Sequence, residues 1–220
     1  MEELTTQWGN FFLRCMLFVT HVMVHGAHNE ETHKASRYKD QQRLTSDLRL
    51  WKIILERSQF REVNAIGFSI IQIQRAVCTV LVNCCTDRTD ASYDNFRGEF
   101  EFITDLCAYV MDARLVPDTL RFEFNGGNVA SALSLVASKC RHYEVRMRAV
   151  QLFRKISWRE GTWDRGAILC NLGQVDMEER ERDSAGNIKP TSRWVWTNTR
   201  WQDGKPYAEY TRAIPVDNEA

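Results

Sequence analysis

The sequence has no surplus of charge of either sign. Lys plus Arg and Asp plus Glu each total 29 among 220 residues, so the formal net charge is zero. This balance excludes a polybasic chain that binds nucleic acid by neutralising phosphates, and it excludes an acidic solvating tail. Only four prolines and eleven glycines are present, which is too few for a linker-rich or disordered protein.

Closely spaced cysteine pairs are also missing. The seven cysteines are an odd number, are irregularly spread, and contain no CxxC motif. That pattern argues against a disulfide framework and against a zinc site made of cysteine. We therefore expect free thiols packed in a core, the adjacent Cys84 and Cys85 among them, in a reducing intracellular compartment. We expect no cofactor.

Motifs for catalysis are absent as well. The sequence contains no GxSxG, no phosphate loop, no GxGxxG and no SxxK, so an enzyme is not expected. The weak candidates for a metal site are His21, His25 and His28, because a spacing of four places the first two on one helix face. The glutamate of an HExxH motif is missing between them. We interpret these histidines as the end of a buried helix and keep a metal-dependent enzyme as an alternative.

The most apolar stretch, residues 11–27, is interpreted as a buried helix. It is shorter than the roughly 20 residues of a spanning helix, and it contains Arg14. A signal peptide begins with positive charge, whereas this chain begins with Glu2 and Glu3. We therefore expect no membrane partner.

Helical periodicity continues through most of the chain. Apolar residues recur at helical spacing in residues 44–60, 63–85, 91–114, 129–140 and 144–156, and a further helix is expected from about Trp163. Thr45 and Ser46 are candidate caps of the first of these helices. Residues 86–90 form a break that is rich in capping residues.

The last part of the sequence predicts a β-hairpin. Residues 193–201 are aromatic and β-branched, Asp203 and Gly204 suit a tight turn, and residues 206–214 form the return strand. The fold class is therefore mainly α: a helical array or bundle of about six to eight helices with a C-terminal hairpin. We divide the chain into an apolar helix with a polar linker (1–40), a helical regulatory-type domain (41–190), the hairpin packed on it (191–215) and a tail (216–220).

Positive charge is concentrated locally between Lys139 and Arg159, with seven cations and one anion, Glu144. Within the helix 144–156 we assign Arg146, Arg148, Arg154 and Lys155 to the outer face. Such a cluster either contacts nucleic acid or an acidic partner, or it forms internal ion pairs. Residues 176–183, rich in Asp and Glu, are candidate internal partners, although Glu178 and Glu179 are interpreted as a solvated face.

One segment carries a family resemblance. Residues 138–150, SKCRHYEVRMRAV, continue through Leu152 and Phe153 to REGTWD at 159–164. This pattern resembles the C-terminal part of the regulatory region of fungal binuclear zinc-cluster transcription factors. The matching positions, to which we assign a structural role, are Lys139, Cys140, Arg141, Arg146, Arg148, Arg159, Glu160, Gly161, Trp163 and Asp164. Weaker similarity extends over about residues 44–215.

The resemblance implies a non-enzymatic regulatory domain that acts in transcriptional regulation through protein contacts. The family's six-cysteine DNA-binding cluster is absent here, so we expect DNA contact only indirectly. The expected partners are proteins, including a homodimer or a heterodimer with a related factor, and a small-molecule effector is compatible with this picture. The expected location is the nucleus, with the cytoplasm as the alternative. A free-standing interaction module, such as a truncated paralogue, is the alternative function.

Overall fold

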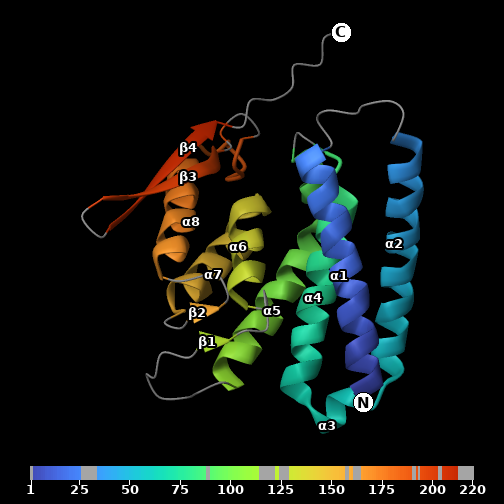
Figure 1. Ribbon diagram of the computed structural model, residues 1–220. Helices are drawn as coiled ribbons and strands as arrows, with labels where there is room; N and C mark the ends of the chain where they lie inside the picture. The colour runs from blue at the N-terminus through green and yellow to red at the C-terminus, as the bar shows by residue number, and fades with distance from the viewer. Residues whose placement is uncertain are drawn as a thin grey trace. The chain divides into compact units, whose positions relative to one another are not determined.

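The computed structural model describes residues 2–25, 34–87, 90–113, 122–123, 129–156, 159–160, 165–189, 192, 194–202 and 205–212. The chain forms two compact units, residues 1–88 and 89–220 (Figure 1). The boundary falls in the break at residues 86–90. It therefore divides the stretch 41–190 that we expected to form one helical domain, and residue 40 lies inside a helix rather than at a linker.

The first unit is an array of helices packed on one apolar helix. It contains α1 (Glu2–His25), α2 (Lys34–Arg57), α3 (Phe60–Val63) and α4 (Ala65–Cys84), and α1, α2 and α3 all contact α4. The expected helix over residues 63–85 is therefore present as α4. The first helix of the periodic series begins ten residues earlier than predicted, so Thr45 and Ser46 lie inside α2 and cap nothing.

The core of this unit joins the inner faces of α1, α2 and α4. Trp8 and Trp51 meet edge to face with ring centroids 5.3 Å apart, and the Trp8 Nε1 donates to Gln74 Oε1 at 2.7 Å. Trp8, Phe11 and Cys15 on α1 are buried at helical spacing, whereas Leu13, Leu17, Met23 and Val24 are more than half exposed, so α1 is amphipathic with one buried face. α4 is long and apolar enough to cross a membrane, but 50% of that window is buried inside the protein, and core helices meet the same criteria.

The second unit consists of packed helices with a C-terminal β-hairpin. A 3-10 helix, η1 (Ala91–Phe96), leads into α5 (Arg97–Ala113), and α6 (Val129–Lys139), α7 (Tyr143–Arg154) and α8 (Arg165–Glu178) follow. α6 contacts α5, α7 and α8, which explains its small buried residues such as Ala130, Ala132 and Ala137. A short parallel pair that the sequence did not predict joins β1 (Phe122–Glu123) to β2 (Arg159–Glu160).

The expected C-terminal hairpin is present. β3 (Trp194–Gln202) pairs antiparallel with β4 (Lys205–Arg212), with an irregularity between Trp196 and Asn198, and both strands contact α8. The contact is close, because a Cβ added to Gly173 of α8 would lie 2.5 Å from the Tyr210 hydroxyl oxygen. The mainly α fold class with a C-terminal hairpin is thus confirmed, whereas the predicted turn at Asp203 and Gly204 lies outside the described residues.

Candidate functional site

The family-like segment begins at the corner between α6 and α7. Its charged residues there form ion pairs with acidic residues at η1. Lys139 Nζ lies 2.7 Å from Asp90 Oδ2 and 5.2 Å from the centroid of the Tyr93 ring. Arg141 Nε donates to Asp94 Oδ1 at 2.7 Å, and its Nη1 reaches the carbonyl oxygen of Ile188 at 3.4 Å. These contacts join η1, the α6–α7 corner and the segment after α8, so both cations have a structural role here.

Arg146 occupies the interior and not the outer face that we predicted. Its side chain and that of Glu178 are both 0% exposed, and Arg146 Nη2 donates to Glu178 Oε2 at 2.8 Å. Its Nε lies 3.1 Å from Glu179 Oε1. The expectation of a solvated face for Glu178 is therefore wrong. A buried charge of either sign needs a partner of the opposite sign, and here each supplies it for the other.

Glu178 also holds two further elements. Its Oε1 accepts from the backbone N–H of Trp194 at 2.9 Å and lies 3.3 Å from Gln174 Nε2. One carboxylate thus connects α7, α8 and the start of β3. Because its hydrogen-bonding capacity is used by protein groups, the buried charge is compensated at each oxygen.

The remaining cations of α7 also find acidic partners within the second unit. Arg148 pairs with Asp105 of α5, and Arg154 Nη2 lies 3.3 Å from Asp176 Oδ1 of α8. Lys155 is exposed, and the side chain of Arg159 lies outside the described residues. The interpretation of this cluster as internal ion pairs is therefore confirmed for Lys139, Arg141, Arg146, Arg148 and Arg154. Arg148 and Arg154 remain more than half exposed within their ion pairs.

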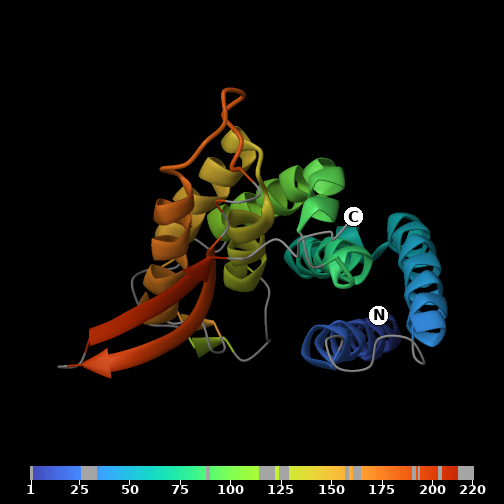
Figure 2. The same cartoon turned by 90° about the horizontal axis from the view of Figure 1, so that it is seen from above.

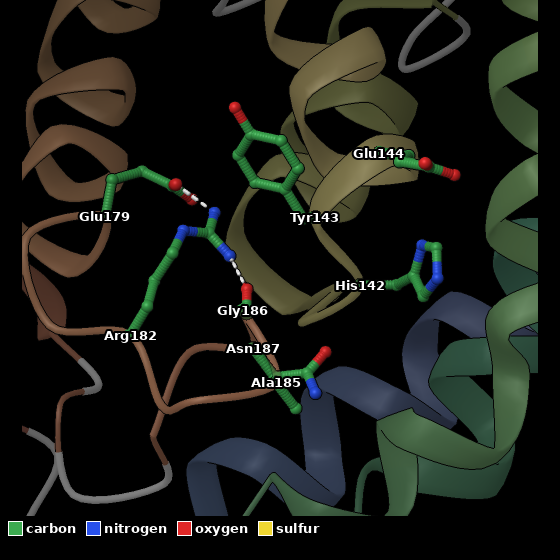
Figure 3. Close-up of a pocket in the computed structure, with 8 residues that line it drawn as sticks. All are labelled: His142, Tyr143, Glu144, Glu179, Arg182, Ala185, Gly186 and Asn187. Atoms are coloured by element: carbon green, nitrogen blue, oxygen red, sulfur yellow. Dashed lines mark hydrogen bonds and ion pairs between the residues drawn. The ribbon is translucent and has the colours of Figure 1, made fainter.

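A cleft opens beside the first turn of α7 (Figure 3). Its volume is about 620 Å³, and its lining residues are His142, Tyr143, Glu144, Glu179, Arg182, Ala185, Gly186 and Asn187. The guanidinium of Arg182 stacks at 4.4 Å from the Tyr143 ring centroid and is held by Glu179 and the carbonyl oxygen of Gly186. A second cavity of about 260 Å³ shares His142 and Asn187 with it.

The chemistry of this cleft is that of a polar binding surface. The positive charge of Arg182 is balanced by Glu179, and Glu144 adds a further carboxylate, so the cleft does not select strongly for anions. Among the lining residues that the structure describes, none is a serine, cysteine or lysine that a neighbouring base could activate as a nucleophile. The Nδ1 atom of His142 is buried and makes no hydrogen bond to a protein group that the structure describes.

Only some of the other predicted site residues lie in the part of the chain that the structure describes. His21 is exposed on α1, the side chain of His25 is not described, and His28 lies outside the described residues. Among the residues that are described, no three His, Cys, Asp or Glu side chains form a metal-binding group. Arg159 and Glu160 lie in β2, and their side chains are not described. Gly161, Trp163 and Asp164 fall outside the described part of the chain.

The sequence suggested residues 176–183 as acidic partners but did not identify Asp90, Asp94 and Asp105. Helical spacing in the sequence does predict burial of Glu178. This residue follows Ile168, Asn171 and Val175 at spacings of three and four on the buried face of α8. A comparable signal exists for Arg146, which lies one turn before Ala149 and Val150. Periodicity thus places both charges inside, against the general preference of charged residues for the surface.

Comparisons with protein-family models, with curated proteins and with solved structures found no match to this chain.

Proposed function

We propose that this chain is a non-enzymatic regulatory domain that acts in transcriptional regulation through contacts with other proteins. The proposal comes from the resemblance of residues 138–164 to the regulatory region of fungal zinc-cluster transcription factors. The single structural observation that supports it is the use of Arg146, a signature position, as the buried partner of Glu178. Arg146 neutralises the carboxylate that joins α7, α8 and β3, so this signature position serves the internal packing of the domain.

The same reasoning gives the expected partners. Because the cations of the segment pair internally, DNA contact would come from a partner with its own DNA-binding element, in a homodimer or heterodimer of related factors. The polar cleft beside Tyr143 and Arg182 is where a small-molecule effector would bind. The proposed location is the nucleus.

A reporter experiment tests the regulatory role. The full chain is fused to an unrelated DNA-binding domain and placed upstream of a reporter gene, with that DNA-binding domain alone as reference. We expect reporter output to change with the fusion, and we expect the change to be lost when Arg146→Ala disrupts the fold. A fusion that is expressed and folded but leaves the reporter unaltered contradicts the regulatory role.

A DNA-binding experiment tests the indirect contact. The isolated chain is incubated with a random-sequence duplex library at physiological salt, and bound duplexes are selected and sequenced. We expect no enriched sequence and only weak binding that salt removes. Enrichment of a defined sequence by the isolated chain would overturn the proposal of indirect contact.

Two alternatives have distinct readouts. A truncated paralogue that acts by pairing would co-purify with a full-length related factor while leaving the reporter fusion silent. A metal-dependent enzyme based on His21, His25 and His28 would contain stoichiometric zinc that His21→Ala with His25→Ala removes. The structure supplies no specific observation in favour of either.

A further inference from the structure

α2 presents a stripe of mixed basic and apolar character on its exposed face. The helix contains seven Lys and Arg residues against three Asp and Glu, and its buried residues are Leu44, Leu48 and Leu55. The exposed stripe lies more than 100° around the helix from that buried face. We call Lys39, Arg43, Leu50, Ile53, Ile54 and Arg57 the α2 stripe, because at 3.6 residues per turn they lie within about 100° of one another around the helix.

The apolar centre of the α2 stripe is open to solvent. Leu50 is 55% exposed, Ile53 is 45% exposed and Ile54 is 37% exposed. Figure 2 shows α1 and α4 on the same side of α2, and the six residues of the stripe are exposed. Burying three aliphatic side chains on one helix face is a favourable contribution to binding, because it removes apolar surface from water.

The cations that bracket this centre differ from those of α7. Lys39 and Arg43 lie on one side of it along the helix, and Arg57 lies on the other. In the part of the chain that the structure describes, no carboxylate forms an ion pair with these three residues, whereas five cations of the family-like segment all have acidic partners. Cations that form no ion pair on both sides of an apolar centre favour a partner of the opposite sign, even with Asp40 and Asp47 three and four residues from Arg43 on the same helix.

We propose that the α2 stripe is the docking site for an acidic amphipathic helix of a partner protein. The stripe is about 27 Å long at the usual helical rise, so it accommodates a helix of about 18 residues. The partner's apolar residues would cover Leu50, Ile53 and Ile54, and its carboxylates would pair with Lys39, Arg43 and Arg57. This inference rests on α2 alone and does not depend on the proposed function, which concerns the second unit.

An anionic membrane surface is the less favoured occupant. Interfacial helices insert their apolar face about 5–10 Å into the headgroup boundary. Ile53 and Ile54 are less than half exposed, so a large part of each side chain is already covered by the protein. The cations also lie in line with the apolar residues instead of on the opposite face. A protein helix, which needs only surface contact, fits this arrangement better.

Fluorescence anisotropy with a designed probe tests the inference. The probe is a labelled helical peptide of about 18 residues, with leucines at helical spacing in its centre and glutamates at both ends of the same face. The matched control peptide has glutamine in place of each glutamate. We expect the full chain to bind the acidic probe, with an affinity that falls as NaCl rises, and to bind the neutral peptide at least about tenfold more weakly.

Variants of the chain locate the binding. The triple change Lys39→Glu, Arg43→Glu and Arg57→Glu is expected to weaken probe binding at least about tenfold, as is Leu50→Ser with Ile53→Ser. Arg49→Glu, at an exposed cation of α2 about 100° away from Leu50, is expected to change it less than about twofold. All changes are at exposed positions, and unaltered far-UV circular dichroism verifies folding.

Three results overturn the inference. The first is no saturable binding of the acidic probe by the folded chain. The second is an equal loss with Arg49→Glu and with the triple variant, which indicates nonspecific charge attraction. The third is flotation of the chain with phosphatidylserine vesicles, lost in the triple variant, without binding of the probe, which assigns the stripe to a lipid surface.

Discussion

Arg146 of α7 and Glu178 of α8 form an ion pair that excludes solvent from both side chains, with 2.8 Å between Nη2 and Oε2. Removing one member leaves the other as a buried charge with incomplete compensation. Such a loss typically lowers the free energy of unfolding by about 3–5 kcal/mol. We therefore expect Arg146→Ala to destabilise the second unit by about that amount in urea unfolding followed by circular dichroism.

The exposed pair on the same helix provides the control. Arg148 pairs with Asp105 at the surface, where an ion pair contributes less than about 1 kcal/mol, so Arg148→Ala should be nearly neutral. Replacing both buried partners, Arg146→Met with Glu178→Leu, should recover part of the loss. About 1–3 kcal/mol should remain, because the N–H of Trp194 loses its acceptor. Equal effects of Arg146→Ala and Arg148→Ala would contradict the buried placement.

Gly173 of α8 and Tyr210 of β4 make the closest approach between the hairpin and the helix. An alanine in a helix is normally more stable than a glycine by about 1 kcal/mol. At Gly173 the added Cβ would lie 2.5 Å from the Tyr210 hydroxyl oxygen, which is closer than van der Waals contact allows. We expect Gly173→Ala to be destabilising in thermal unfolding, against the intrinsic preference, because the rigid tyrosine ring and its strand must move.

Two further variants test whether the contact with Tyr210 causes the loss of stability. Tyr210→Phe removes the closest atom, so it should restore part of the stability that Gly173→Ala removes. Gly98→Ala in α5 adds a Cβ with nothing within 4 Å, so it should be neutral or stabilising by up to about 1 kcal/mol. A stabilising Gly173→Ala would show that the hairpin does not pack on α8 as described.

Much of the fold follows from apolar periodicity in the sequence. α4 and α6 are continuous apolar patterns, and the Asp203–Gly204 pair between two aromatic runs predicted the hairpin. The start of α2 was missed because its first ten residues are polar, and no apolar stripe marks them. A tertiary contact helps to hold this polar part of α2 in the helix, because Gln41 Nε2 donates to the carbonyl oxygen of Val82 in α4 at 2.7 Å.

The candidate site was less predictable than the fold. Charge composition correctly suggested acidic partners in residues 176–183, but the general rule that arginine lies outside gave the wrong face for Arg146. Partners such as Asp90 and Asp94 lie almost fifty residues before Lys139 and Arg141. Only tertiary folding brings such residues together, so no local pattern identifies them. The cleft beside Tyr143 also depends on the fold, because its two walls come from α7 and the segment after α8.

Glu181 fastens the end of the hairpin in a pH-dependent way. Arg212 of β4 donates to its Oε1 at 2.6 Å and Ser192 donates to its Oε2 at 2.9 Å, and these bonds lower the pKa of the Glu181 carboxyl. A lowered folded-state pKa stabilises the protein above the unfolded-state pKa of about 4.3. That contribution is lost as the pH falls through the lowered value.

The pH dependence can be isolated with one conservative variant. We expect wild type to be more stable than Glu181→Gln at pH 7 and the two unfolding curves to converge as the pH falls below about 4. Urea unfolding at a series of pH values measures the difference. A stability difference that stays constant over this range would mean that the Glu181 carboxylate does not hold Arg212.

The cysteines of the described core should behave as unreactive thiols. Burial raises the pKa of Cys85 to about 11, and the pKa of Cys78 is raised by the neighbouring Cys15 thiol and by burial. The reactive species is the thiolate, and at pH 8 only about one Cys85 in a thousand is ionised. We therefore expect iodoacetamide at pH 8 to leave Cys15, Cys78, Cys84, Cys85, Cys107 and Cys140 unmodified in the folded chain, as measured by peptide mass spectrometry. The same treatment in urea should label all six, and a Cys84–Cys85 disulfide or rapid labelling of native Cys85 would contradict the free, protonated state that the structure describes.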